Sequence, residues 1–186
     1  MNRTELLQKI ETAIRKRSPL LAEHLQPGIQ MKTVDRRLRR ISGLTQPLYD
    51  IYGWHDGISP YRWQTGVTYH FSYSLKELGF FPDENFFFMD LERAVVQLGY
   101  FSEIAKRRPA LKEGIGRYFP LLWDGSTAYF TLDLDRDSHN RVVFFENESV
   151  MPYQEAYATI DEFLLDVLHA NETGESLCFF EDGLKG

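Results

Sequence analysis

The chain has 186 residues, of which 43% are hydrophobic and 26% are charged. These values are typical of one globular domain and exclude a disordered chain, a collagen and a membrane-embedded helix bundle. No apolar run approaches the roughly 18 residues of a membrane-spanning helix, so we expect no membrane association. The single cysteine, Cys178, excludes an internal disulfide, and the N-terminus lacks the pattern of a secretory signal. Both features favour a reducing, cytoplasmic location.

The net charge of −6 is distributed unevenly. Residues 1–40 carry ten Lys or Arg and four Asp or Glu, whereas residues 119–186 carry three and fourteen. An acidic surface repels nucleic acid and attracts a basic partner. The arginine cluster at residues 36–40 has no interleaved aromatic side chains for base stacking, so we interpret it as the solvated side of an amphipathic helix. We therefore expect no nucleic-acid binding.

Helices are predicted for the first part of the chain. Apolar residues at helical spacing predict a first helix capped by Asn2, and Ser18-Pro19 opens a short second helix. A third helix is expected to begin after Thr33 as its cap. Residues 45–52 predict a fourth helix, which ends in a turn-rich stretch at residues 53–57.

The middle of the chain changes its periodicity. Residues 66–75 alternate aromatic or apolar side chains with polar ones and predict a half-buried strand, and Phe86–Met89 predicts a short one. Asp90 is placed to cap a strongly periodic helix. On this helix and on the last helix of the chain, the residues expected in the core are Leu91, Val95, Leu98, Phe101, Phe163 and Val167.

Three successive strands are predicted next: Tyr118–Trp123, Ala128–Leu134 and Val142–Phe145. Turns at residues 124–126 and 136–140 join them. Thr159 begins a capping box that opens the last helix, and Leu177–Phe180 is expected to add an edge strand. Because helices and strands do not alternate regularly, the order favours an α+β fold over a parallel doubly wound sheet.

Aspartates at positions 133, 135 and 137 resemble the start of a calcium loop. An EF-hand loop would need glycine at its sixth position and glutamate at its twelfth, where this sequence has Ser138 and Phe144. We therefore predict no metal site, and no dinucleotide or phosphate-binding motif indicates a cofactor.

His55 and Asp56 are the other candidates for chemistry. They could act as a base and its orienting carboxylate, but adjacent side chains rarely point in the same direction. We therefore predict that the protein is not an enzyme. A small metal-dependent hydrolase that uses His55, Asp56 and the aspartates at 133–137 is the enzymatic alternative.

Several short segments occur in a recognisable order along the chain. They read LYDIYGWHDG at residues 48–57, FFP at 80–82, FPLLWDG at 119–125, LDL at 132–134, RVV at 141–143 and TIDEFL at 159–164. In order and spacing this series resembles the SUKH superfamily, the group of Smi/Knr-like cell-wall assembly regulators and bacterial immunity proteins. The resemblance covers about residues 30–170.

The resemblance implies an α+β fold with a twisted, mostly antiparallel mixed sheet and helices packed on it. The whole chain, 1–186, would be a single SUKH-like domain with an N-terminal helical extension at 1–30 and a short C-terminal tail at 171–186. Trp54 would anchor its turn, and Gly57 would supply a backbone conformation that other residues resist. The motif residues with structural roles are Trp54, Asp56, Gly57, Pro120, Asp124 and Gly125.

The resemblance also implies a non-enzymatic binding protein. Its expected task is immunity, in which it binds and neutralises a bacterial toxin such as a nuclease, whose basic face would suit an acidic surface. A regulatory scaffold in cell-wall signalling is the alternative. From the predicted hairpin we assign partner binding to Asp133, Asp135, Asp137, Glu146 and Glu148. Alternation places the three aspartates on one face if the chain stays extended.

Overall fold

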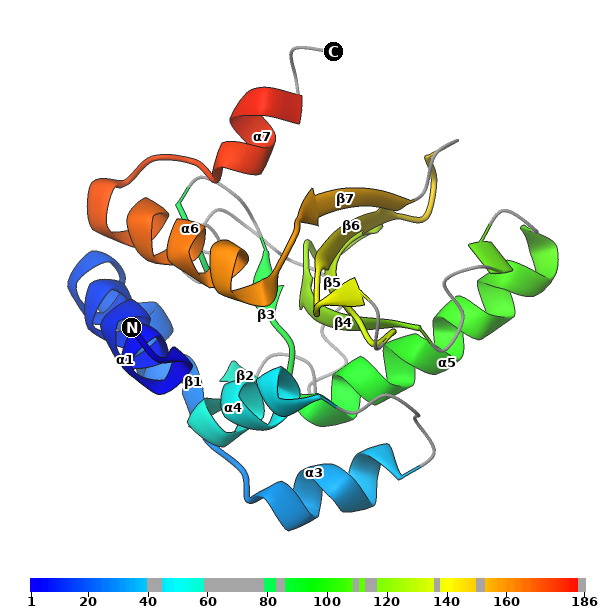
Figure 1. The fold of residues 1–186 in the computed structure, drawn as a ribbon, viewed down its shortest axis with the longest axis horizontal. Helices are drawn as coiled ribbons and strands as arrows, with labels where there is room; N and C mark the ends of the chain where they lie inside the picture. Colours follow the sequence, from blue (N-terminus) through cyan, green and yellow to red (C-terminus); the bar gives the residue numbers. More distant parts are fainter. Residues whose placement is uncertain are drawn as a thin grey trace.

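The fold is that of a computed structural model, which describes residues 1–39, 45–58, 79–82, 86–108, 111–112, 117–135, 138–149 and 153–183. A five-stranded antiparallel sheet and a two-stranded antiparallel sheet are combined with helices (Figure 1). This arrangement confirms the predicted α+β class. The strand predicted at residues 66–75 lies outside the described residues.

The N-terminal helices are α1 (Arg3–Arg17), α2 (Pro19–His24), α3 (Met31–Leu38) and α4 (Gln46–Trp54). The predicted capping box at Asn2 is confirmed, since its side chain and that of Glu5 each accept a hydrogen bond from the other's backbone N–H. Ser18 caps α2 as predicted. The predicted start of α3 is wrong: the helix begins before Thr33, whose backbone N–H donates to the carbonyl of Gln30.

A two-stranded sheet joins distant parts of this N-terminal region. Strand β1 (Leu25–Pro27) pairs antiparallel with β2 (His55–Ile58). The turn predicted at residues 53–57 is wrong, because α4 continues to Trp54 and the chain then extends directly into β2. Gly57 has the predicted positive φ, at +72°, and a Cβ added there would overlap the backbone nitrogen of Asp90.

The main sheet has the order β3-β4-β5-β6-β7. Its strands are β3 (Phe87–Phe88), β4 (Tyr118–Trp123), β5 (Ala128–Asp133), β6 (Val142–Glu146) and β7 (Tyr153–Tyr157). Four of these strands were predicted at nearly these bounds, whereas β7 was not predicted. At the β4–β5 turn, Asp124 Oδ1 accepts hydrogen bonds from the backbone N–H groups of Ser126 and Ala128, and Gly125 has a φ of +87°. The predicted hairpin role of Asp124 and Gly125 is confirmed.

The remaining helices are α5 (Leu91–Arg107), α6 (Ile160–Thr173) and α7 (Cys178–Gly183). Asp90 and Thr159 cap α5 and α6 as predicted. The edge strand predicted at Leu177–Phe180 is wrong, because this segment leads into α7. The Asp166 carboxylate accepts a hydrogen bond from the backbone N–H of Cys178, a donor that the first turn of a helix leaves unpaired.

One side of the main sheet is an aromatic layer beneath α6 and α7. Phe130 on β5 lies at the centre of this layer, and its ring centroid is 5.4 Å from that of Phe163 on α6. Two aromatic residues of α7 cover the same side, with the Phe180 ring 5.9 Å from Phe130 and the Phe179 ring 5.1 Å from Phe144. The C-terminal helix thus packs against the core through Phe179 and Phe180.

Helix α5 lies on the other side of the sheet (Figure 1). Phe101 on α5 makes edge contacts with Tyr129 and Phe145, at centroid distances of 4.9 and 4.7 Å. Tyr118 on β4 and Tyr153 on β7 lie only 4.8 Å apart. Since three strand spacings of about 4.8 Å separate β4 from β7 in a flat sheet, the sheet must curl across this side to bring the two rings together.

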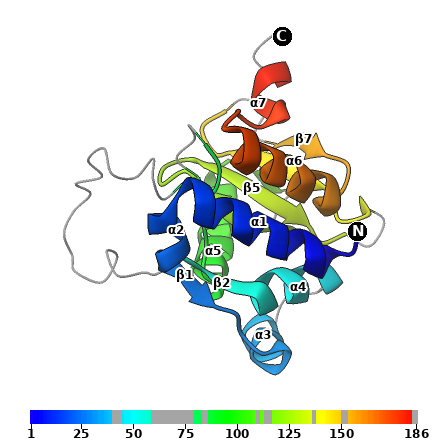
Figure 2. The ribbon, with the colours of Figure 1, turned by 90° about the vertical axis from the view of Figure 1, so that its left-hand side faces the viewer.

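Most of the predicted core is confirmed. Leu91, Phe101, Phe163 and Val167 are buried, whereas Val95 and Leu98 are only half-buried at the borders of the inner face of α5. Helix α1 lies beside α6 (Figure 2) and contributes Ile10 and Ile14, both fully buried, to the same core. Among the described helices, none is both long and apolar enough to cross a membrane.

Candidate protein-binding surface

Of the acidic residues predicted to bind a partner, those that the structure describes lie at opposite ends of the β5–β6 hairpin. Asp133 is the last residue of β5, whereas Glu146 pairs with Ala128, the first residue of that strand. A strand rises about 3.3 Å per residue, so these two ends are about 17 Å apart. Asp137 lies outside the described residues. The expected single patch therefore does not form.

Asp133 does not belong to an exposed surface. Its side chain is 0% exposed, and its carboxylate accepts two hydrogen bonds from Arg117 and one from Arg141, each 2.8 Å long. Burial alone would raise the pKa of Asp133, but the two guanidinium groups and the backbone N–H of Asp135 hold that pKa below its ordinary value. The carboxylate is thus a charged structural group, and its assignment as a surface contact was wrong.

The chain also does not stay extended after β5. The backbone N–H of Asp135 donates to Asp133 Oδ1 at 3.0 Å, which turns the chain immediately after the strand. Ser138 Oγ then donates to the carbonyl of Asp135 at 2.6 Å. The Asp135 side chain is 44% exposed, but it lies 3.6 Å from Arg117. The extended backbone that was the condition for aligning the aspartates on one face therefore ends at Asp133.

At this end of the sheet, arginine side chains lie beside the carboxylates and balance their charge. Arg141 links the buried Asp133 to Glu155 on β7, at 3.0 Å from Glu155 Oε2. Arg117 lies over the Tyr118 ring at 5.3 Å while it holds Asp133. Two arginines thus balance most of the local negative charge, and this cluster stabilises the sheet rather than presenting an acidic surface.

At the other end of the hairpin, the carboxylates are more accessible. Glu148 is exposed and Glu146 is half-buried. Arg108, after the basic end of α5, donates from Nη2 to the carbonyl of Ser149 at 2.9 Å. The positively charged side chain of Arg108 therefore lies near this end of the hairpin.

The outer side of α6 has a different character. We define the α6 face by Asp161, Glu162, Leu165 and Glu172, all of which are exposed. Leu165 is 48% exposed between the carboxylates of the first and last turns. No Lys or Arg occurs in the sequence between residues 142 and 183. On this side of α6, Leu165 therefore lies one turn from Asp161 and from the exposed His169, with Glu162 beside it and Glu172 two turns further along the helix.

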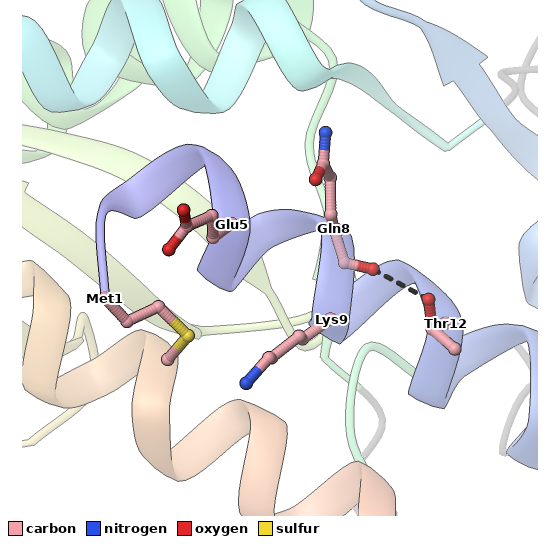
Figure 3. Close-up of a pocket in the computed structure, with 5 residues that line it drawn as sticks. All are labelled: Met1, Glu5, Gln8, Lys9 and Thr12. Carbon is pink, nitrogen blue, oxygen red and sulfur yellow. Dashed lines mark hydrogen bonds between the residues drawn. The ribbon is translucent and has the colours of Figure 1, made fainter.

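Helix α1 borders this face. Arg3 donates to both Asp161 and Asp50, at 2.7 Å each, and so fixes the start of α6 against α1 and α4. Lys9 and Met1 point from α1 toward α6 (Figure 3). An open pocket of about 360 Å³ lies on the outer surface of α1, lined by Met1, Glu5, Gln8, Lys9 and Thr12 (Figure 3). Thr12 Oγ1 already donates to the carbonyl of Gln8 at 2.9 Å.

The α6 face was not predicted from the sequence. Its signal was present in the capped helix, where the polar positions that do not face the core are mainly acidic. The aspartates of the hairpin were favoured instead because they are close together in sequence. The acidic surface is identified by the side of the helix on which the carboxylates lie, and not by how close together they are in the sequence.

His55 and Asp56 point toward different partners. The His55 Nδ1–H donates to the carbonyl of Gln26 at 2.8 Å, and Asp56 Oδ1 accepts a hydrogen bond from the backbone N–H of Leu91 at 2.8 Å. Burial raises the pKa of Asp56 even though the Leu91 N–H opposes this rise. The two side chains therefore join separate elements and do not form a base with its orienting group.

The other motif residues occupy structural positions. Trp54 donates from Nε1 to Glu11 Oε2 at 3.2 Å and stacks on Phe88 at a centroid distance of 6.2 Å. Pro120 pairs with Thr131 beside an irregularity in the β4–β5 register. These contacts hold α4 against α1 and bend β4. Within the described part of the chain, no group of three or more His, Cys, Asp or Glu side chains is arranged to hold a metal ion.

These features define an α+β protein with an acidic helix face and a buried ion cluster. The chain matches no protein-family model and no curated protein.

Proposed function

We propose that this chain is a non-enzymatic binding protein of the Smi/Knr-like type, and that it acts as an immunity protein that neutralises a bacterial toxin in the cytoplasm. The observation that carries the proposal is the α6 face, where the exposed Leu165 shares one side of the helix with the exposed carboxylates of Asp161, Glu162 and Glu172. An exposed apolar residue inside a charged rim is the usual arrangement of a protein-binding site.

The residues that could perform chemistry support this proposal because each has a structural partner. Asp133 is bound by two arginines, Asp56 caps the start of α5, and His55 donates to a backbone carbonyl. A carboxylate that is committed in this way is poorly placed to receive a proton from a substrate. The other ring nitrogen of His55, Nε2, lies inside the protein at 3.5 Å from Glu11 Oε2. The same contacts give these residues structural roles.

The charge of the α6 face indicates the kind of partner. Toxins that act on nucleic acid bind phosphates through Lys and Arg, so the face that they use is basic. An acidic helix would attract such a face and raise the association rate by roughly 10- to 1000-fold at low salt. The toxin thereby loses access to its own polyanionic substrate.

Growth rescue tests the proposed function. If the neighbouring open reading frame encodes a toxin domain, that domain is expressed in a test bacterium with and without the chain. Restored growth together with a 1:1 complex of the two purified proteins supports immunity. Binding to a non-toxic cell-wall enzyme without rescue would support the scaffold role instead. Failure of both binding and rescue with the adjacent toxin domain would contradict the immunity proposal.

Charge reversal tests the surface. Glu162→Lys with Glu172→Lys should slow association with the toxin by about tenfold or more at low salt and flatten its salt dependence. The matched control is Glu23→Lys on α2 with Glu103→Lys on α5, which changes the net charge by the same amount at exposed positions of other helices. An unchanged association rate in a normally folded α6 variant would place the interface elsewhere on the protein.

A further inference from the structure

One ring nitrogen of His55 has no hydrogen-bond partner. The ring lies at the start of β2, and its side chain is 13% exposed. Nδ1 is bound to the carbonyl of Gln26 on the paired strand β1, at 2.8 Å. Nε2 is buried and forms no hydrogen bond with any described residue. Folded proteins rarely leave such a group unpaired, so the group that faces Nε2 indicates its role.

The group that faces Nε2 is a carboxylate. Glu11 Oε2, on α1, lies 3.5 Å from Nε2, which is about half an ångström longer than a typical N–H···O hydrogen bond. The same oxygen accepts a hydrogen bond from Trp54 Nε1 at 3.2 Å, and Arg15 binds the other oxygen, Oε1, at 2.6 Å. Two donors thus hold this carboxylate beside the imidazole ring.

The contact with Gln26 determines which nitrogen carries the proton in the neutral ring. A carbonyl oxygen can only accept a hydrogen bond, so Nδ1 must be protonated. In the neutral ring, Nε2 then has a lone pair and no proton, and this lone pair faces Glu11 Oε2. Two acceptors that face each other make no hydrogen bond. A second proton, on Nε2, would convert the same contact into a charge-assisted hydrogen bond.

Glu11 stays ionised over the pH range in which an imidazole ordinarily titrates. Burial alone would raise the pKa of Glu11, but hydrogen bonds from Arg15 and Trp54 hold that pKa below its ordinary value. The carboxylate is therefore charged at about pH 5 and above. Across that range, only the imidazole of this pair changes its charge.

The other groups around the ring do not replace Glu11 as a partner. Asp56 follows His55 in β2, but its Oδ1 already accepts a hydrogen bond from the backbone N–H at the start of α5, at 2.8 Å. The neutral ring of Trp54 makes an edge contact with the imidazole at 4.5 Å. Arg15 is the cation on this side, and 60% of its side chain is exposed. Solvent therefore screens its repulsion of a charged imidazole.

We propose that His55 and Glu11 form a proton-dependent contact between α1 and the small sheet, in which Nε2 donates to the carboxylate when it is protonated. The added proton gains this acceptor only in the folded chain, so proton binding favours the folded state. The stabilisation is complete well below about pH 6.5, where the imidazole of an unfolded chain is also protonated. It is lost as the pH rises and Nε2 releases its proton.

This contact is separate from the proposed toxin binding. Its groups belong to α1, β1 and β2, and none of them lies on the α6 face. Charge reversal on α6 should leave the pH dependence of stability unchanged. Loss of the His55–Glu11 contact should likewise leave association with the toxin unchanged. Failure of one proposal would therefore be distinguishable from failure of the other.

Stability measured against pH tests the contact. His55→Asn removes Nε2 but keeps a donor for Gln26, because the asparagine amide nitrogen takes about the place of Nδ1. From about pH 8 to about pH 5, the folding equilibrium constant of the wild type relative to His55→Asn should rise at least about fivefold. In a Glu11→Gln background this rise should disappear. A ratio that does not change with pH, or that rises equally in the Glu11→Gln background, would overturn the proposal.

His24→Asn on α2 is the matched control. His24 Nδ1 is also bound to a backbone carbonyl, that of Leu20 at 2.9 Å. In the described part of the chain, however, the histidines paired with carboxylates are His55 and His169. The rise relative to His24→Asn should therefore be clearly smaller than the rise relative to His55→Asn. Equal rises for the two variants would contradict a specific role of Glu11.

Nitrogen NMR of the His55 ring gives a direct measurement that does not depend on the stability of the Asn variant. Between about pH 8 and about pH 5, Nδ1 should carry a proton throughout and Nε2 should gain one. At an intermediate pH, a smaller fraction of the ring should be protonated in Glu11→Gln than in the wild type. A ring that is still neutral at about pH 5, or whose neutral form carries its proton on Nε2, would show that the proposal is wrong.

Discussion

The two sides of the main sheet are both buried, but by different means. Beneath α6 and α7 the contacts are aromatic, with Phe130 in ring contact with Phe163 and Phe180. On the α5 side the sheet curls until Tyr118 meets Tyr153, and it encloses the carboxylate of Asp133 with its two arginines. The first side is stabilised by apolar area, which tolerates changes in detail, whereas the second combines the ring contacts of Phe101 with one buried charge that must be paired.

Because both sides of the sheet are covered, its central strands do not alternate in burial. All six residues of β4 and all six of β5 are buried. Thr131 remains on the buried α5 side because its hydroxyl donates to the carbonyl of Val143 at 2.9 Å. Polar residues in these strands therefore mark satisfied interior positions, not a solvent-facing side.

The largest expected effect is on the aromatic side. Phe130→Ala should lower the free energy of unfolding by about 3–5 kcal/mol, because it removes a fully buried ring from several aromatic contacts. Phe101→Ala on α5 is the matched control and should cost clearly less, since the Phe101 ring packs chiefly on Tyr129 and Phe145 and is slightly more exposed. Chemical denaturation of both variants measures the difference. Equal losses would mean that the two sides are equally sensitive to lost apolar area.

Local patterns in the sequence were sufficient for the features that depend on chain neighbours. Side-chain caps at Asn2, Asp90 and Thr159 and the Asp124-Gly125 turn require only residues a few positions away, and all are confirmed. These features determine most helix starts and the β4–β5 hairpin, so the sequence predicts both.

Long-range pairing was beyond the sequence patterns. The charge of Asp133 suggested an exposed position. The sequence patterns do not show that Arg117, 16 residues away, pairs with this carboxylate in the interior. Strand β7 was missed because its exposed Gln154 and Glu155 obscure alternation at the edge of the sheet. The direct passage from α4 into β2 was missed because His55–Gly57 has turn-forming residues, whereas pairing with β1 keeps this segment extended.

The second expected effect concerns the paired charge on the α5 side. Asp133→Asn should lower the free energy of unfolding by about 2–3 kcal/mol. This loss is smaller than that expected on breaking a fully buried ion pair, because Arg117 and Arg141 keep about a quarter of their side chains exposed. Asn preserves the size of the side chain, so urea denaturation reports the lost charge rather than a cavity. A loss of unfolding free energy smaller than that expected for an exposed ion pair would show that water, in place of Asp133, accepts the hydrogen bonds of the two arginines.

Acid should act on the same side. The pKa of Asp133 is lowered in the folded protein, so its contribution is complete above the unfolded pKa of about 3.9 and is lost as the pH falls through the lower folded value. The difference in unfolding free energy between wild type and Asp133→Asn should therefore shrink below about pH 4. Parallel stability curves from pH 7 to pH 3 would contradict this assignment.

A third test concerns the contact between the small sheet and the start of α5. Gly57→Ala should cost about 2 kcal/mol or more, because a positive φ disfavours alanine and the new Cβ would overlap the backbone at Asp90. Gly53→Ala is the control: it lies in α4, where a Cβ meets no described atom within 4 Å, and it should be neutral or stabilising. Thermal melts of the two variants should therefore move apart. Equal melting temperatures would mean that β2 can move away from Asp90.

The smallest expected effect separates the buried and exposed partners of a single arginine. Arg141 holds Asp133, which is 0% exposed, and Glu155, whose side chain is 56% exposed. Glu155→Gln should cost less than about 1 kcal/mol, since an exposed ion pair gains little over solvation in water. Its cost should also fall toward zero in about 1 M salt, where the screening length is near 3 Å, whereas the cost of Asp133→Asn should persist. Urea denaturation of both variants at low and high salt measures this. A cost for Glu155→Gln that equals or exceeds that of Asp133→Asn would mean that the exposed carboxylate, rather than the buried one, fixes Arg141 across the curled side of the sheet.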